Sequence, residues 1–145
     1  MGIFDKIKFH MGDSVGFVTK KMESWEPKKC KTEKDYEKSL YQFLHDELGD
    51  LQVTKQYAKG RIRADLMIGD KVIIELKHNL DTTGKYQRLI GQISEYKEWD
   101  GRVIILLTGE TDMNLRKQLD AFIKKEGLGD SYLITEETKV TVFQK

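Results

Sequence analysis

The most constraining feature of the sequence is an uninterrupted apolar run, Val103 to Leu107. Side chains along a strand point alternately to opposite faces of the sheet, so a wholly apolar strand must be covered on both faces. The run is also far shorter than the roughly 20 apolar residues that span a bilayer. It therefore predicts an interior strand of a sheet with helices on its two faces, in a chain of 145 residues that matches one globular domain.

The segments around this strand alternate between helical and extended patterns. Apolar residues recur every three or four positions in the expected helices and every second position in several expected strands. Thr32 and Asp35 resemble a capping box, and Gly127 marks the end of the last helix. The expected helices are 32–48, 85–99 and one from 111 or 112 to 127, and the expected strands are 51–57, 61–68, 71–77, 103–108, 132–135 and 140–143. This order combines hairpins with crossovers, so the sequence predicts an α/β domain with a mixed central sheet flanked by helices.

The register of the central hairpin brings two carboxylates together. The even-numbered residues of 61–68 and of 71–77 are all apolar. To bury both sets on one face, Ile68 must pair with Val72, and this register places Asp65 opposite Glu75. Their Cβ atoms would then lie roughly 5 Å apart, with Lys77 two residues further along the same face. Such a pair of like charges indicates either a divalent cation or a solvated polar face whose charges pair crosswise.

Two further motifs extend this pattern into a resemblance to a known family. Asp65, nine intervening residues and Glu75-Leu76-Lys77 resemble the core of the PD-(D/E)XK nuclease superfamily. Glu37 stands where members often carry a helical glutamate, and Gln92 to Tyr96 is similar to the QxxxY element of RecB-like members. One departure is Ala64, where the superfamily's name has proline. The resemblance spans about residues 33–108 and implies a restriction-endonuclease-like fold with the core order αβββαβ.

The resemblance also implies roles for individual residues. It implies Mg²⁺, with Mn²⁺ as a substitute, held by Asp65, Glu75, the Leu76 carbonyl and Glu37. Lys77 would polarise the nucleophile and stabilise charge on the phosphate, and Gln92 and Tyr96 would reach the water or a phosphate from one side of their helix. Tyr96 also lies on an apolar stripe and fits simple packing, and Gln92 fits a surface amide. Glu33 competes with Glu37 for the helical position, although its place in the first turn suits the helix dipole.

Positive charge is concentrated near these residues. The net charge is only +1, which excludes binding of nucleic acid by bulk charge alone, but residues 55–88 carry 8 basic and 4 acidic side chains. The candidate nucleic-acid contacts are Lys55, Lys59, Arg61, Arg63, His78, Lys85 and Arg88. The expected function is cleavage of DNA, more than RNA, with selectivity for structure over sequence. The alternative is a nuclease-fold module that binds nucleic acid or a protein partner without cutting.

The N-terminal residues 1–31 form a separate arm in this interpretation, ahead of a domain at 32–145. Apolar residues follow a near-heptad rhythm over 3–25, which predicts an amphipathic helix that ends before Pro27. Such a helix would dock on its own domain, on the twin subunit of a homodimer, on a membrane surface or on another protein. The single cysteine, Cys30, and the lack of a secretory signal pattern lead us to expect a cytoplasmic protein.

Overall fold

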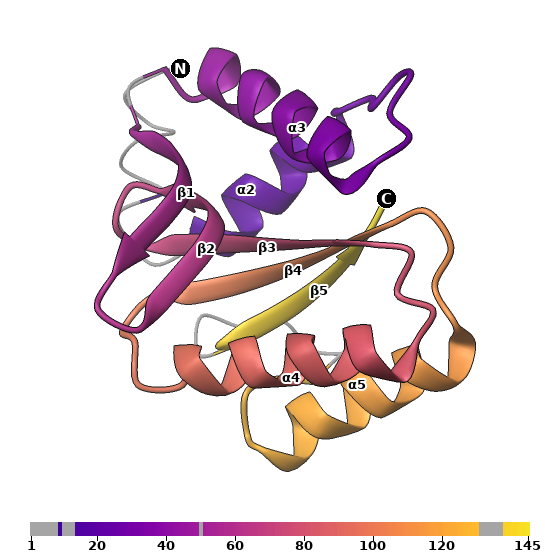
Figure 1. The fold of residues 1–145 in the computed structure, drawn as a ribbon. Coiled ribbons are helices and arrows are strands. Elements are labelled where there is room, and N and C mark those ends of the chain that lie inside the picture. Colours follow the sequence, from indigo (N-terminus) through magenta and orange to yellow (C-terminus); the bar gives the residue numbers. More distant parts are fainter. Residues whose placement is uncertain (1–8, 10–13, 50, 131–137) are drawn as a thin grey trace.

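A five-stranded mixed sheet forms the centre of the molecule. The computed structural model describes residues 9, 14–49, 51–130 and 138–145. The strands lie in chain order: β1 (Val53–Lys59), β2 (Ile62–Ile68), β3 (Val72–His78), β4 (Arg102–Thr108) and β5 (Val140–Gln144). β2 pairs antiparallel with β1 on one side and with β3 on the other, whereas β4 pairs parallel with both β3 and β5. The predicted α/β class is confirmed, with helices on both faces of the sheet (Figure 1).

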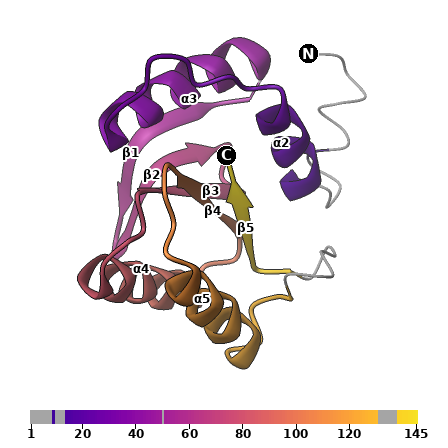
Figure 2. The same ribbon diagram turned by 90° about the vertical axis from the view of Figure 1, so that its right-hand side faces the viewer.

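The chain path determines which helices cover which face. α4 (Thr83–Tyr96) and α5 (Met113–Lys125) connect successive parallel strands that advance in one direction across the sheet. Because crossovers of this kind share one hand, both helices lie on the same face (Figure 2). α2 (Ser14–Glu23) and α3 (Glu33–Glu47) cover the opposite face, which the crossovers leave bare.

The apolar strand and the helix ends agree with the sequence prediction. Val103 to Leu107 are all fully buried in β4 between the two helical layers. Thr32 caps α3 through the predicted capping box, since its side chain accepts from the Asp35 amide and the Asp35 carboxylate accepts from the Thr32 amide. Asp112 is the N-cap of α5, one residue before its first turn.

The N-terminal arm packs into the same core as the sheet. Phe9, Phe17, Met22 and Trp25 are buried in one cluster with residues of α3 and of the central strands. The rest of the predicted helix at 3–25 and the predicted strand at 132–135 lie outside the described residues. Within the described ranges, no helix is long and apolar enough to cross a membrane.

The hairpin register is confirmed in one half and wrong in the other. Leu66 pairs with Ile74 and Ile68 with Val72, as burial of their side chains requires. Ile62 and Ala64, predicted to share that face with Leu66, pack instead in the cluster beneath α4. The ladder between β2 and β3 stops at Leu66. The remaining residues of β2 pair with β1 alone, and this part of β1 and β2 curves toward α4 (Figure 2).

Candidate functional site

The two predicted carboxylates lie where the β2–β3 ladder ends. Regular pairing runs from Ile68–Val72 to Leu66–Ile74 and does not continue to Asp65 and Glu75. Instead, the Asp65 carboxylate reaches across and accepts a hydrogen bond of 2.8 Å from the Leu76 amide. Since the N–H and C=O of one strand residue point to the same side, the Leu76 carbonyl also faces this gap. The break leaves backbone and carboxylate oxygens together at one point between two strands.

On the other side of β2, the ladder with β1 is also interrupted opposite Asp65. Gln56 has φ of 49°, in the left-handed region that residues other than glycine rarely adopt. The flanking pairs Lys55–Leu66 and Tyr57–Ala64 keep the same register. The Gln56 side chain donates to Glu37 at 2.7 Å, so α3 holds this distorted turn of β1. Asp65 is therefore free of regular pairing on both sides.

Glu75 is almost completely buried, with 2% of its surface exposed, and is surrounded by polar groups of α4. Gln92 Nε2 donates to one of its carboxyl oxygens at 3.0 Å, and the Tyr96 hydroxyl lies 2.7 Å from the other. Lys77 Nζ lies 3.8 Å from Glu75 Oε1. The same Tyr96 hydroxyl contacts the Arg63 carbonyl oxygen. The QxxxY element thus contacts the predicted catalytic strand directly.

The surroundings of Glu75 favour its protonated form. Burial, followed by the neighbouring charge of Asp65, raises the pKa of Glu75 to about 8. The hydrogen bond from the Tyr96 hydroxyl acts in the opposite direction and lowers the pKa of Glu75, but it is a smaller influence than burial and the Asp65 charge. Burial and the adjacent Glu75 charge raise the pKa of Tyr96 as well, so it remains a hydrogen-bond donor.

One polar atom of this site lacks a partner. Gln92 Oε1 is buried and has no hydrogen-bond partner among the described residues, while Nε2 of the same amide is bound to Glu75. A buried acceptor without a donor is costly, and native structures usually supply a ligand or water for it. Gln92 therefore offers an acceptor to a water or ligand held beside Glu75.

A basic groove leads to these residues. It has a volume of about 840 Å³ and runs between the hairpin turn at Gly60 and the exposed face of α4. Its walls carry Lys77, Gln92 and Tyr96 together with three of the predicted nucleic-acid contacts, Arg61, Arg63 and Arg88. A smaller pocket of about 260 Å³ adjoins it at Lys77 and Arg88, and contains His78 and Lys85. Five of the seven predicted contacts thus gather around Lys77.

The structure places three other predicted site residues away from this group. Lys55 Nζ lies 4.7 Å from the centroid of the Tyr41 ring on α3. Lys59 lines a separate cleft. Glu37 is half-buried and bound to Gln56, so the structure does not bring it into a three-carboxylate cluster. Indeed, the described part of the chain contains no group of three or more His, Cys, Asp or Glu side chains arranged to hold a metal.

Glu33 lies closer to the end of β3 than its position in the sequence suggested. Its carboxylate accepts a hydrogen bond of 3.2 Å from the His78 amide, across 45 residues of sequence. In the sequence, the place of Glu33 in the first turn of α3 favours an interaction with the helix N-terminus. Its spacing of four residues from Glu37 is the signal that could have placed both side chains on the same face of the helix. The role of Gln56 had no sequence signal.

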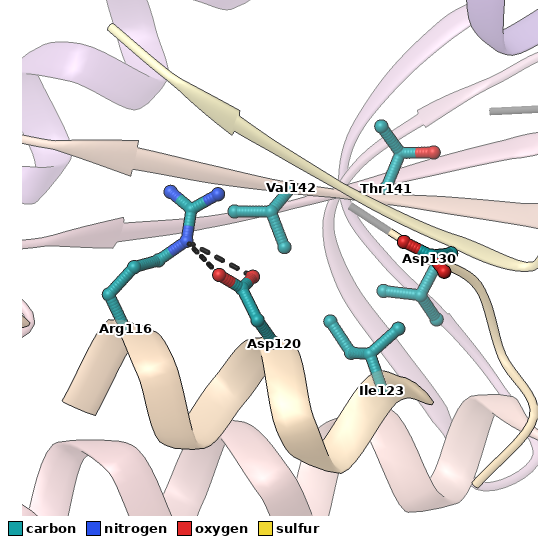
Figure 3. Close-up of a pocket in the computed structure, with 7 residues that line it drawn as sticks. Arg116, Asp120, Ile123, Asp130, Thr141 and Val142 are labelled. Carbon is teal, nitrogen blue, oxygen red and sulfur yellow. Dashed lines mark hydrogen bonds and ion pairs between the residues drawn. The ribbon is translucent and has the colours of Figure 1, made fainter. Parts of the chain in front are cut away.

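A small enclosed cavity among the described residues lies apart from this site. It lies between α5 and β5, at the far edge of the sheet from the hairpin, and has a volume of about 40 Å³ (Figure 3). An ion pair between Arg116 and Asp120, at 3.2 Å, lines it beside Ile123 and Val142. Its size suits only a few water molecules.

The fold and site together define an α/β protein with two adjacent carboxylates and a lysine at a break in its central sheet, beside a basic groove. Comparisons with protein-family models, with curated proteins and with solved structures give no match.

Proposed function

We propose that the protein is a Mg²⁺-dependent nuclease of restriction-endonuclease-like fold that hydrolyses phosphodiester bonds in DNA. One observation carries the proposal: Lys77, which lines the basic groove, lies 3.8 Å from the buried Glu75, and Asp65 is bound to the intervening Leu76 at a break in the ladder. A structural strand gains nothing from two carboxylates in a buried gap, because each raises the cost of ionising the other. A site that binds a cation and a phosphate explains why both carboxylates are present.

The donor set fits magnesium. Mg²⁺ prefers oxygen ligands, needs only one or two carboxylates and keeps several waters. The Asp65 and Glu75 carboxylates would hold it, with the Leu76 carbonyl, and the unpartnered Gln92 Oε1 supplies an acceptor for a water beside them. When bound, Mg²⁺ supplies charge neutralisation at the phosphate and activation of the attacking water. Glu37 supports this site through Gln56 at the break in β1.

Lys77 provides the fixed positive charge of the reaction. It is largely buried, and its ammonium group lies between Glu75 and the groove. From there it stabilises the charge that develops on a scissile phosphate, while Arg61, Arg63 and Arg88 position the flanking backbone. Contacts to phosphates carry no sequence information directly, so a groove whose arginines follow the backbone selects its substrate by structure over sequence.

The test is metal-dependent cleavage of supercoiled plasmid and of labelled single-stranded, duplex and branched DNA. Wild type should cut at least one substrate in Mg²⁺ or Mn²⁺ and none in EDTA. Asp65→Asn and Lys77→Ala should each lower the rate on the order of 10²-fold or more while the melting temperature stays near that of wild type. Asp46→Asn, an exposed change on α3, serves as the matched control and should cut normally. Absence of cleavage under all conditions would refute the proposal.

A second candidate function is a nuclease-fold module that binds nucleic acid or a protein without cutting it. The observation in its favour is that the described residues assemble only two carboxylates at the site, without a third ligand side chain. The same assay separates the two functions. A binding module would retain labelled DNA in a mobility-shift experiment, with equal affinity in Mg²⁺ and EDTA.

A further inference from the structure

We infer that the smaller pocket beside Lys77 binds a nucleotide that presents a free sugar hydroxyl, an inference that rests on the proposed nuclease function. The pocket lies at the carboxyl end of β3, where ligands commonly bind in α/β sheets. Lys77 and Arg88 line both this pocket and the basic groove, so the two spaces adjoin and a strand in the groove can extend into the pocket.

The walls of the pocket come from both helical layers. Glu33 reaches it from the first turn of α3, and Lys85 and Arg88 reach it from the first two turns of α4. His78 lies between them, with its ring against Tyr36 at 4.9 Å and its Nδ1 3.1 Å from Thr108 Oγ1. Lys85 is oriented by the Asn79 carbonyl and by Asp81, both at 2.9 Å. His78 and Lys85 are therefore held in place by their neighbours.

The charges in the pocket do not neutralise one another. Of the ion pairs formed by the described residues, none joins Glu33 to Lys77, Lys85 or Arg88, although all four line the same 260 Å³. Arg88 has no ion pair or hydrogen bond from its side chain within the described ranges. A carboxylate and several cations that face one space without contact suit a ligand with both an anionic group and a hydrogen-bond donor.

A nucleotide with a free hydroxyl has this combination. Its phosphate suits Arg88 and Lys77, because cations bind phosphate oxygens and arginine does so with two parallel hydrogen bonds. Its hydroxyl can donate to Glu33, whose ionised carboxylate accepts but cannot donate. A second phosphate at the hydroxyl position would instead meet the Glu33 charge. The hydroxyl can come from a strand end or from the 2′ position of ribose.

The experiment measures binding without cleavage. The full chain with Asp65→Asn is titrated against labelled oligothymidylates, and anisotropy reports the affinity. One pair of probes ends in a 3′-hydroxyl or a 3′-phosphate, a second pair in a 5′-hydroxyl or a 5′-phosphate, and a third pair has ribose or deoxyribose at one internal position with both ends blocked. The same titration with wild type in EDTA replaces the variant if Asp65→Asn does not fold.

In at least one pair, the probe with the free hydroxyl should bind roughly tenfold more tightly than its partner, which is the effect of one hydrogen bond to a charged group. Glu33→Gln should remove most of this preference, and Glu47→Gln, at the other end of α3, should retain it. The pair that shows the preference identifies the source of the hydroxyl. Equal binding of all probes, or an unchanged preference in Glu33→Gln, would overturn the inference.

These outcomes can be distinguished from the outcome of the cleavage assay. If wild type cuts DNA but Glu33→Gln leaves end preference unchanged, the nuclease function stands and the hydroxyl pocket fails. If no DNA is cut but the hydroxyl preference depends on Glu33, the pocket stands and the catalytic proposal fails.

Discussion

The two halves of β3 are built differently. Val72, Ile73 and Ile74 are fully buried, apolar and paired with neighbouring strands on both sides. From Glu75 onward, the strand continues to pair with β4 but loses its regular pairing with β2. The same strand therefore passes from a closed half, 72–74, to an open half, 75–78.

This difference separates stability from chemistry within one strand. The closed half contributes apolar burial, which favours folding in proportion to the area removed from water. The open half contains a carboxyl group that is buried beside another, which opposes folding when the group is charged. Pairing with β4 keeps the open half rigid, so the polar groups keep their positions despite this cost.

The largest effect should come from the closed half. Ile74→Ala should lower the free energy of unfolding by roughly 2–5 kcal/mol, since it leaves a cavity between two strands and the α2–α3 layer. Lys77→Ala in the open half should change the same quantity by less than about 1 kcal/mol. Urea denaturation of both variants measures the contrast. Similar losses in the two variants would show that the halves are not energetically distinct.

The next effect concerns Glu75 and pH. Because its folded pKa is about 8 and its ordinary value is 4.5, the folded state binds the proton more tightly than the unfolded state. Protonation of Glu75 therefore contributes to the free energy of unfolding. This contribution is complete below about pH 4.5 and is lost as pH rises to about 8, at up to roughly 1.4 kcal/mol per pH unit. Glu75→Gln should therefore be no more stable than wild type at pH 5 and clearly more stable at pH 8. Urea midpoints at the two pH values measure this change.

A matched control locates the effect. Glu47→Gln, at the exposed end of α3, should show the same pH dependence of stability as wild type. If Glu75→Gln also follows wild type at both pH values, Glu75 is ionised throughout this range and its environment is more polar than its burial indicates.

The sequence predicted the closed half more completely than the open half. The pairing of Leu66 with Ile74 and of Ile68 with Val72 follows from burial of alternate apolar residues, which depends only on local pattern. The same reasoning failed for Ile62 and Ala64, because the curvature of the hairpin depends on where the ladder ends. An alternation pattern contains no information about that end point.

Within the site, contacts along one strand or one helix were accessible from sequence, and contacts between layers were not. The spacing of Glu75 and Lys77 and of Gln92 and Tyr96 placed each pair on one face, and the structure brings the two pairs together. Whether Glu33 or Glu37 faces the strand depends on how α3 is oriented over the sheet. That orientation follows from tertiary packing, and it takes Glu37 to Gln56 and Glu33 to His78.

A smaller effect should follow from removal of one hydroxyl in the open half. Tyr96→Phe removes the group that contacts both Glu75 and the Arg63 carbonyl, and should lower the free energy of unfolding by about 1–2 kcal/mol. Its hydrogen bond lowers the pKa of Glu75, so the variant should require higher pH to ionise that group. We expect the acid limb of the pH–rate profile for cleavage to move to higher pH.

Tyr86→Phe on the same helix is the matched control, since its hydroxyl has no hydrogen-bond partner within the described part of the chain. It should leave both the stability and the pH profile unchanged. A loss of stability in Tyr96→Phe without a shift of the acid limb would mean that Tyr96 only packs against the strand.

The smallest effect should come from the cap of α3. Thr32→Ala removes one half of the capping box and should lower the free energy of unfolding by about 1 kcal/mol. It loosens the first turn, where Glu33 accepts the His78 amide, so that amide should exchange with solvent faster. The Ile74 amide belongs to the closed half and should keep its protection relative to global unfolding. Hydrogen exchange at the two amides, measured by NMR, therefore compares the halves directly, and equal acceleration at both would show that they open as one unit.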